Sequence, residues 1–488
     1  MATVVGNAGN ATRLLRTVDA TPTNRLGADS LFVVPALVIG GAIVAGMALE
    51  FAPLTTVAAL AAMGVALVSP AVGLALIAFM GPLQPPLVIP APGFNALLVA
   101  AAVLGCVYRL PLDRPRISLS APMLLLIGFV LYVAVQQTPE MVAGYTGSVG
   151  YRSYSLFREL VTGFGTVLVA AYVLPGRSPF PFLAIVLGSA TFAAVIAILT
   201  VNSPVVGPPI AGLLTHSVIA GRGIGPFGNP NYFGTFEAIA IVTAVGLMFG
   251  TRSVRIRWVL LAACVVCGIG VALSLSRGAI IALAAGLACL AFSRFRARIA
   301  VGIAAGLLAA GLVLFPIFLD WRLSITNGSD SAASYSGLAQ SDAGRGGAAL
   351  AGPQLFMMSP LFGIGWGQYT PMSVQFTGPG NSINAHNWYV SVLAEQGTVG
   401  IVLTTMLLVA LVAALRTRPR FPRSVGFGAL GAYAVGSLFL EAPTTFETSV
   451  LPILVIVAAL ASDWTTPPRA GRRPADEEVP APIRQGHR

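Results

Sequence analysis

Charged side chains are scarce in this chain of 488 residues, because only 9% of its residues are Asp, Glu, Lys or Arg. Soluble domains carry roughly a quarter charged residues, so the composition excludes a water-soluble globular protein. Lysine is absent, and all 28 basic residues are arginine. With the abundant Ala, Gly and Val, this indicates a GC-rich genome and not a particular chemistry.

Cysteines and histidines are few, with four of the former and three of the latter. The cysteines all lie in apolar runs, and two of them, Cys264 and Cys267, form a CVVC sequence. A redox or metal site needs an accessible thiolate and usually further ligands, which are missing nearby. HExxH, DxD and Walker A sequences are missing as well. We therefore expect buried cysteines and no metal or other cofactor.

Long apolar runs make up most of the chain, which is 56% hydrophobic. Runs of about 17–22 residues match the ~20 residues that cross a ~30 Å hydrocarbon core as a helix. The sequence predicts an all-α polytopic transmembrane helix bundle of about 12–14 spans, of which the tight second and third leave a re-entrant pair open. The expected spans are 31–49, 53–69, 71–90, 93–108, 119–136, 155–174, 181–200, 230–250, 257–273, 278–293, 299–319, 398–415, 424–440 and 448–462.

The polar segments define the remaining regions. Residues 1–30 and 463–488 have the composition of disordered cytoplasmic tails on either side of a membrane domain at 31–462. Residues 1–30 contain no short apolar stretch, so no cleavable signal peptide is visible. Residues of about 320–397 are expected to form one large extracytoplasmic loop, and loops of that length are usually functional.

Arginine sets the orientation. With the N-terminus inside, 22 of the 28 arginines fall at cytoplasmic helix ends, as the positive-inside rule requires. The net charge of +11 is thereby explained without a nucleic-acid partner. The other six arginines fall on the outer side, against the rule, so we predict that the outer face is the functional one. They are Arg152, Arg158, Arg222, Arg277, Arg322 and Arg345.

The stretch GRGIGPFGNPNYFG places Arg222 shortly before a helix that Asn229 or Asn231 can cap. A helix N-terminus presents free N–H groups to an anion, and Arg222 stands beside it. The alternative is a plain turn with a cap and a snorkelling arginine.

Two further arginines have a similar setting. The stretch SLSRG puts Arg277 between two apolar spans with almost no loop, where a charge close to hydrocarbon indicates function. Arg345 lies in the large loop, in SDAGRGG. A guanidinium pairs well with two phosphate oxygens at once, so an anionic ligand is favoured.

The stretch NSINAHNWYVSVLAEQGTVG holds His386, Asn387 and Glu395 at the end of that loop. An imidazole with a pKa near 6.5 can accept a proton from a hydroxyl nucleophile near neutral pH. If this stretch is helical, Asn387 lies beside His386, and Glu395 lies two to three turns further along. The alternatives are a hydrogen-bonded interfacial histidine and a carboxylate that pairs with an arginine in helix packing.

The stretches SPLFGIGWGQY and NAHNWYVSVLAEQGTVGIVL resemble the signature region of the O-antigen ligase and polymerase superfamily. GNPNYFG and SLSRG are similar to other outer-face motifs of that family, and the resemblance covers about residues 220–415. It implies an architecture like that of C-type glycosyltransferases. It also implies metal-independent, inverting transfer of a glycan from a polyprenyl-diphosphate carrier to a hydroxyl of a glycan, lipid or protein acceptor. The reaction is expected at the outer face of the cytoplasmic (inner) membrane, in contact with membrane lipid.

The resemblance also implies roles for individual residues. His386 matches the catalytic histidine, Arg345 the essential loop arginine, and Arg222 and Arg277 the arginines that hold the diphosphate. The family's loop arginine is soon followed by an aromatic residue, and RGGAALAGPQLF departs from that pattern. We expect four neighbours to contribute to substrate binding as well: Asn229, Asn231, Asn387 and Glu395.

Two other classes of function stay open. Outer arginines also suit a membrane transporter of a small anion, although a carrier usually places charges near the bilayer midplane, where this sequence looks apolar. A non-catalytic scaffold of the cell envelope would not need His386. Within the enzyme class, the sequence does not separate a ligase from a polymerase.

Overall fold

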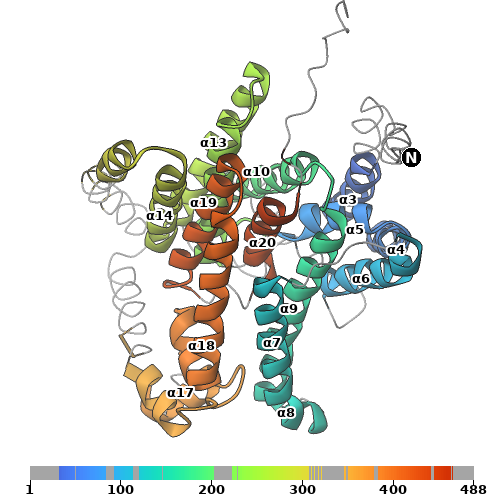
Figure 1. Cartoon of the computed structure of the whole chain (residues 1–488). Coiled ribbons are helices and arrows are strands. Elements are labelled where there is room, and N and C mark those ends of the chain that lie inside the picture. Colours follow the sequence, from blue (N-terminus) through green and yellow to red (C-terminus); the bar gives the residue numbers. More distant parts are fainter. Residues whose placement is uncertain are drawn as a thin grey trace, which may run out of the picture.

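The computed structural model describes most of the chain between Phe32 and Trp464. Apart from one isolated bridge between Pro175 and Ser462, the regular elements in this part are helices (Figure 1), which confirms the all-α membrane bundle. The tails and Arg345 lie outside the described residues. These are 32–49, 51–83, 93–113, 120–144, 147–202, 222–227, 229–306, 346–347, 350–377, 383–440, 445–462 and 464, with single positions at 309, 313, 317 and 320.

The N-terminal half contains a tight helical pair, Ala52–Val68 (α4) and Pro70–Met80 (α5). The two helices meet at Ser69 with no loop between them, because Pro70 has no backbone N–H with which to continue α4. With 11 residues, α5 is much shorter than the ~20 needed to cross the membrane, and it is buried almost throughout. The helices here are α3 (Val33–Ala48), α4 (Ala52–Val68), α5 (Pro70–Met80), α6 (Phe94–Asp113), α7 (Ala121–Gln136), α8 (Thr138–Val142), α9 (Gly147–Val173) and α10 (Phe180–Asn202).

The C-terminal half supplies the elements around the candidate site. They are α12 (Pro230–Met248), α13 (Val254–Ser274), α14 (Arg277–Arg294), α17 (Tyr369–Thr377), α18 (Trp388–Arg416), α19 (Arg420–Gly436) and α20 (Phe446–Ala461). Across the described part of the chain, 7 helices are long and apolar enough to cross a membrane, and further apolar helices are shorter. The chain is therefore a multi-pass membrane protein.

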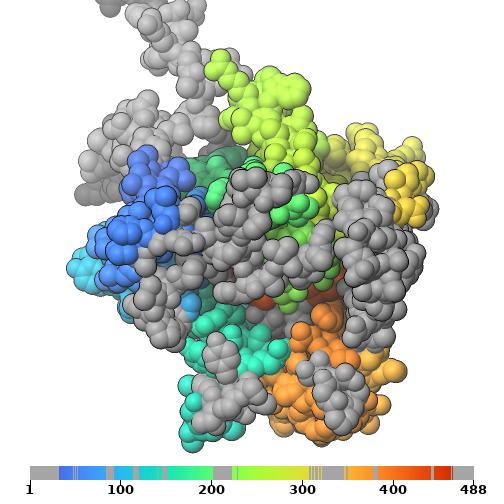
Figure 2. Space-filling view, turned by 180° about the vertical axis from the view of Figure 1, so that it is seen from behind, coloured from blue at the N-terminus to red at the C-terminus, as the bar shows by residue number. Residues whose placement is uncertain are grey.

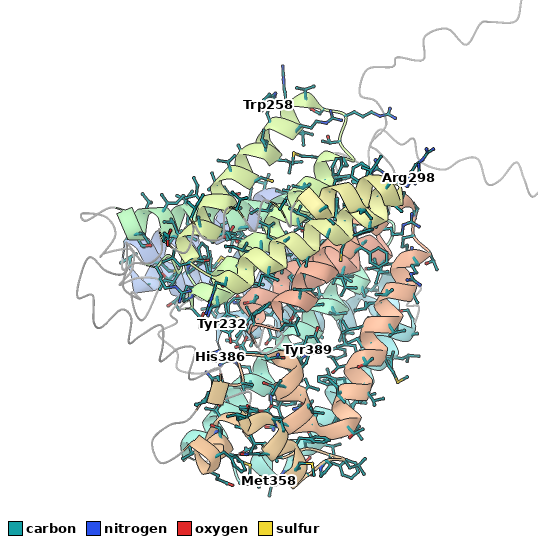
Figure 3. All side chains as sticks on the ribbon, turned by 90° about the vertical axis from the view of Figure 1, so that its left-hand side faces the viewer. Tyr232, Trp258, Arg298, Met358, His386 and Tyr389 are labelled. Carbon is teal, nitrogen blue, oxygen red and sulfur yellow. The ribbon has the colours of Figure 1, made fainter. Side chains whose placement is uncertain are left out.

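Arginine-rich connections gather at one end of the bundle. They follow α12, α14 and α18, at residues 252–257, 294–298 and 416–423. In Figure 3 the starts of α12 and α18, marked by Tyr232 and Tyr389, lie at mid-height. The same view shows Trp258 and Arg298 toward one end and Met358 at the opposite one.

Small residues let α19 pack closely against α14 and α12. A Cβ atom added to Gly431 would lie 2.5 Å from Sγ of Cys289, and one on Gly286 would lie 2.7 Å from Cβ of Ala432. Inside a bilayer, where hydrocarbon surrounds both partners, such close approach is a main source of helix association. The pair α14 and α19 thus forms a tightly packed wall.

The expectation of apolar helix centres is wrong at one place. Glu237 lies near the middle of α12, is 0% exposed and sits beside the Cys267 thiol of α13. An isolated glutamate within an apolar run gives no periodic signal, so the sequence pattern concealed it. An ionisable residue at such a depth is expensive and is a functional candidate by default.

One predicted boundary also differs. The span expected at 398–415 is the second part of α18, which already begins at Trp388. Its two parts join at Gly397, whose φ of 64° and ψ of −158° are not helical. Glu395 and Gln396 of this stretch resemble a loop in sequence, whereas in the structure they are buried residues of the first helical segment.

Candidate functional site

Three helices begin at the candidate site, and each has a polar cap. Oδ1 of Asn229 accepts from N of Asn231 at 2.8 Å at the start of α12, and Oγ of Ser276 accepts from N of Ala279 at 3.3 Å at the start of α14. At α18, Oδ1 of Asn387 accepts from the backbone N–H groups of Tyr389 and Val390 in the first turn, at 3.0 and 3.2 Å. Helix N-termini carry a partial positive charge and favour anions.

Arg222 ties the first two helix ends together. Its Nε donates to the carbonyl oxygen of Ser274 at 2.9 Å, and Nη2 donates to Oδ1 of Asn231 at 3.2 Å. The backbone N–H of Gly223 donates to the carbonyl of Leu273 at 2.7 Å, which fixes the preceding segment on α13. The guanidinium is thus fixed at the N-terminus of α12, as an arginine that binds an anion requires.

A strained turn positions Arg277 as the first residue of α14. Leu275 has a φ of 51°, a left-handed conformation that is rare for such a side chain. Ser274 holds this turn, because its Oγ accepts from N of Ser276 at 3.2 Å and donates to the carbonyl of Val271 at 2.7 Å. The half-buried Arg277 therefore begins α14 directly after the turn whose Ser274 carbonyl accepts from Arg222.

His386 occupies a turn just before α18 and is not part of a helix, and Asn387 is the N-cap residue of α18. The φ of His386 is 50°, one of two positive values among the described non-glycine residues. Histidine tolerates this region better than most residues. The side chain is half-buried between the buried Ala385 and Trp388. Figure 3 places His386 at mid-height, near the labels of Tyr232 and Tyr389.

The C-terminal end of α19 and the residues that follow it, 436–439, connect the histidine turn to the arginines. The carbonyl oxygen of Ser437 accepts from the backbone N–H of Trp388 at 2.8 Å. On the other side, a Cβ atom added to Gly436 would lie 2.8 Å from Cγ2 of Thr235 in α12, and one on Gly278 would lie 2.7 Å from Cβ of Phe439. The structure thus brings together Arg222, Asn229, Asn231, Arg277, His386 and Asn387.

Glu395 lies deeper and has structural contacts. It is 6% exposed, and its Oε1 accepts from the backbone N–H of Tyr369 at 2.9 Å, at the start of α17. Its backbone carbonyl accepts from N of Gly365 at 2.9 Å. Glu395 therefore holds the glycine-rich turn 359–368 against α18. Its substrate-binding role stays a prediction.

That glycine-rich turn fits against the bend in α18. A Cβ atom on Gly363 would overlap the carbonyl group of Glu395, and one on Gly397 would lie 2.6 Å from N of Gly363. Oη of Tyr132 in α7 donates to the carbonyls of Phe362 and Gln396, at 2.9 and 2.8 Å. Figure 2 shows the teal region, to which α7 belongs, and the orange region, to which the glycine-rich turn and the start of α18 belong, along the lower edge of the molecule.

Some residues of the site were not singled out from the sequence. Ser274 and Ser276 shape the turn before Arg277, and a serine directly before an apolar helical run is the signal that could have indicated the cap. Arg152 was noted only for its position on the outer side. Its Nη2 donates to Oδ1 of Asn384 at 2.9 Å, beside the histidine turn.

This leaves three arginines of the outer group, Arg158, Arg322 and Arg345, and the question of a metal site. Arg158 forms an ion pair with Glu159 at 2.6 Å, so its outer position has a local cause. Arg322 and Arg345 lie outside the described residues. Within the described part, three or more His, Cys, Asp and Glu side chains do not come together as metal ligands.

A comparison with protein families gives one match, at residues 262–405, to the family described as O-antigen ligase. The matched stretch runs from α13 into α18 and so contains Arg277, the glycine-rich turn and His386, whereas Arg222 precedes it. The resemblance to the O-antigen ligase and polymerase superfamily is confirmed for this stretch. No curated protein matches the chain.

Proposed function

From the O-antigen ligase match, which supports an enzyme of ligase or polymerase type in cell-envelope polysaccharide assembly, we propose that the protein transfers a glycan from a polyprenyl-diphosphate carrier to an acceptor hydroxyl. The reaction takes place at the outer face of the cytoplasmic membrane. The observation that carries the proposal is the convergence of Arg222, Arg277 and His386 at three helix N-termini, with the α19 end between them.

In the proposed step, the oxygen of the acceptor hydroxyl attacks the anomeric carbon of the glycan. The bond from that carbon to the diphosphate oxygen breaks, and the diphosphate leaves with the bonding electrons, so the configuration inverts. His386 takes the proton of the acceptor hydroxyl as general base. Such proton transfer typically contributes ~10²–10⁴-fold to a rate.

The arginines and helix ends act on the leaving group. Negative charge on the lipid diphosphate grows as the glycosidic bond breaks, and fixed donors in a site with little water stabilise it strongly. Arg222 is already held in place by Ser274 and Asn231, so its guanidinium needs little reorganisation during the reaction. Arg277, at the N-terminus of α14, is the second diphosphate ligand.

The surrounding polar residues position this site. Asn229 and Asn387 cap α12 and α18, and Asn231 orients Arg222; each is also proposed to contact substrate. Glu395 fixes the turn beneath the histidine segment. Arg345 is proposed to reach the donor from the large loop.

The test compares lipid-linked glycans in cells that contain wild-type protein or His386→Ala at matched protein levels. We expect the variant to accumulate polyprenyl-diphosphate-linked glycan and to lose the mature polymer. The length of the lost product then separates a ligase, which transfers finished glycan, from a polymerase, which joins repeat units. An unchanged lipid-linked pool would contradict the proposal.

A transporter of a small anion is the second candidate, and Glu237 is the observation that favours it. This buried carboxyl lies near the middle of α12, where a carrier would place a coupling group. Uptake of phosphate or sulfate into proteoliposomes that depends on Glu237 would favour it. A scaffold function instead predicts that His386→Ala changes neither glycan transfer nor uptake.

A further inference from the structure

One outer arginine, Arg152 near the start of α9, has neither a diphosphate role nor an acidic partner. It begins the span Arg152–Val173, on the side where the positive-inside rule disfavours arginine. Arg158, further along α9, is paired with Glu159, whereas Arg152 forms no ion pair with a described residue. Nε of Arg152 is also buried without a hydrogen-bond partner in the described part of the chain. Burial of a charged group that no opposite charge balances is costly, so its position needs another cause.

The partner of Arg152 is the segment that leads into the histidine turn. Its Nη2 donates to Oδ1 of Asn384 at 2.9 Å, and Oγ1 of Thr370 in α17 donates to the same oxygen at 2.7 Å. The backbone N–H of Ile383 donates to Oγ of Ser373, also in α17, at 2.9 Å. Two helices, α9 and α17, therefore hold this segment at the residues just before the turn.

The other end of the turn is fixed as well. Asn387 caps α18, and the backbone N–H of Trp388 donates to the carbonyl oxygen of Ser437 at 2.8 Å. Between these two anchors, His386 has a φ of 50°, which is strained for a residue with a side chain. Such strain persists only where the surrounding structure imposes it. Loss of the anchor at Asn384 would let the turn relax.

The outer end of α9 is itself held in place next to the turn. Oγ of Ser153 donates to the carbonyl oxygen of Trp366 at 3.2 Å and accepts from Nε2 of Gln368 at 3.1 Å. A Cβ atom added to Gly367 would lie 3.0 Å from Cα of Ser153. Ser153 thus contacts the glycine-rich turn, while the preceding Arg152 contacts the segment before the histidine turn.

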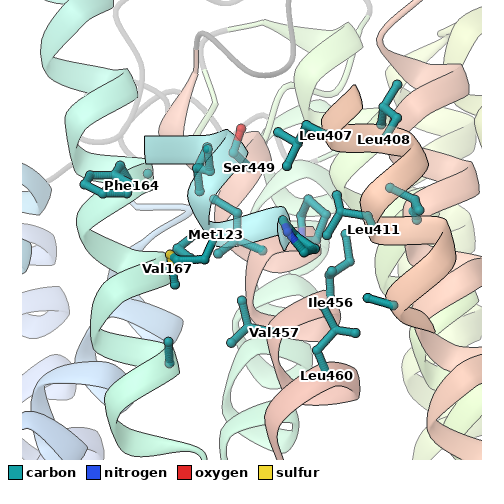
Figure 4. Close-up of a pocket in the computed structure, with 18 of the residues that line it drawn as sticks. Met123, Phe164, Val167, Leu407, Leu408, Leu411, Ser449, Ile456, Val457 and Leu460 are labelled. Atoms are coloured by element: carbon teal, nitrogen blue, oxygen red, sulfur yellow. The ribbon is translucent and has the colours of Figure 1, made fainter. Parts of the chain in front are cut away.

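Deeper in the membrane, a cavity of about 490 Å³ lies between α9 and α18 (Figure 4). On α9 its lining runs from Glu159 to Ala171, and α7, α18, α19 and α20 line it as well. Trp388 belongs to the lining, as do Leu430 and Tyr433 of α19. Close side-chain packing normally fixes the spacing of two helices. Because the cavity interrupts that packing here, the bonds at the outer end of α9 gain weight in placing the histidine turn.

We propose that Arg152 is a positioning residue, which through Asn384 holds the histidine turn in the conformation in which His386 acts as base. The role of His386 rests on the proposed function, whereas the anchoring of the turn can be tested without it. A hydrogen bond from a charged donor is roughly twice as strong as a neutral one, which suits a bond that opposes backbone strain. Arg152 acts on the turn and not on the substrate.

The first experiment is a double-mutant cycle on the full-length protein in membrane vesicles, which contain the acceptor. The donor is the lipid-linked glycan extracted from His386→Ala cells. Arg152→Ala and Asn384→Ala should each lower kcat by about 10–100-fold and leave the KM for the donor unchanged, because a displaced base loses its alignment. The double variant should be as slow as the slower single variant. Arg152→Lys and Asn384→Asp should restore most of the rate, because each retains the donor or the acceptor.

The second experiment reads the conformation of the turn without transfer. Diethyl pyrocarbonate modifies accessible imidazoles, and mass spectrometry gives the rate of modification at His386. We expect the reaction to be about threefold or more faster in Arg152→Ala and Asn384→Ala, because a relaxed turn opens more often. Arg255→Ala is the matched control, since it removes an exposed arginine at the arginine-rich end of the bundle. It should change neither kcat nor the rate of modification.

The outcomes separate this inference from the proposed function. If Arg152→Ala slows transfer further in the Asn384→Ala background, or raises the KM for the donor, Arg152 contacts substrate and the positioning role is overturned. Unchanged modification of His386 in Arg152→Ala would overturn it as well. If His386 is modified faster as expected, but His386→Ala leaves the lipid-linked glycan pool unchanged, the anchor stands and the proposed glycan transfer is contradicted.

Discussion

The two faces of α19 differ in almost every property that matters for chemistry. One face is lined by glycines and packs closely against α14 and α12, and its C-terminal end lies at two capped helix N-termini that carry Arg222 and Arg277. The other face presents Leu430 and Tyr433 to an apolar cavity of about 490 Å³. The first face lies next to arginines that are held in place, and the second borders an open cavity.

This difference shows how a bundle with few charges can build a polar site. Charges are expensive within hydrocarbon, so the arginines stand at helix ends, where Arg222 finds acceptors in the carbonyl of Ser274 and in Oδ1 of Asn231. The close packing of α19 against α14 and α12 restricts movement of these helix ends. The cavity on the other face is separate from this wall, so each face can be tested without the other.

The largest expected effect is at the junction of the two faces. His386→Asn removes the proposed base but suits the backbone, because asparagine also tolerates the φ of 50° found at this position. We expect transfer to fall by ~10²–10⁴-fold, measured with purified protein and lipid-linked glycan. Near-normal transfer by His386→Asn, together with a defect in His386→Ala, would show that the turn matters and that the base does not.

On the polar face, Arg277→Lys keeps the charge and loses the guanidinium fork. We expect the rate of transfer to fall by about 10–100-fold, because a bidentate phosphate contact is replaced by a point charge. Arg222→Lys should do the same and also lose the bonds to Ser274 and Asn231. The rate is measured with lipid-linked glycan, and the binding constant of polyprenyl diphosphate shows whether a diphosphate contact has been lost. Wild-type affinity in Arg277→Lys would contradict its diphosphate role.

The packed face can be tested through stability. Gly431→Ala introduces a Cβ atom 2.5 Å from Sγ of Cys289, so we expect a loss of ~1–3 kcal/mol from overpacking. Gly268→Ala in α13 is the matched control, since no heavy atom lies within 4 Å of its added Cβ. Thermal unfolding in detergent should show a lower midpoint for the first variant and an unchanged or higher one for the second. Equal midpoints would contradict the tight wall.

A smaller effect is expected at the cap of α18. Asn387→Ala removes an acceptor for two backbone N–H groups and should cost ~1 kcal/mol, whereas Asn387→Asp retains a cap. Thermal unfolding and transfer are measured on the same preparations. If transfer is normal in Asn387→Asp, capping explains the residue. If it is lost while stability is kept, the amide contacts substrate.

The smallest effect is expected from removal of divalent metal ions. We predict that transfer survives EDTA, because arginines and helix ends supply the charge that a metal would otherwise supply. The rate with and without EDTA, followed by add-back of Mg²⁺ or Mn²⁺, measures this. A strict requirement for a metal ion would overturn the proposed mechanism.

Much of the fold could be predicted because hydrocarbon imposes a simple rule on sequence. Apolar runs of the right length appeared as helices, since each backbone group in a bilayer must be satisfied within its own segment. The rule fails where burial comes from protein and not from lipid. α5 is too short to cross, and Glu237 is hidden inside an otherwise apolar helix.

The candidate site was predicted less completely. Arginines on the wrong side of the positive-inside rule pointed to Arg222 and Arg277, because their position demands a cause. The sequence could not show that the α19 end joins them to the histidine turn, because that contact links residues far apart in the chain. The same reason conceals the cavity, whose lining comes from five helices.

The contact between Gly363 and Gly397 has a mechanical consequence. With no side chain on either residue, the glycine-rich turn and the bend of α18 lie back to back, and Glu395 and Tyr132 fasten them from two directions. The turn and the segment from Trp388 to Gln396 are therefore fastened into one unit. A displacement of the turn would be passed along this unit to its start, where His386 precedes Trp388 by two residues.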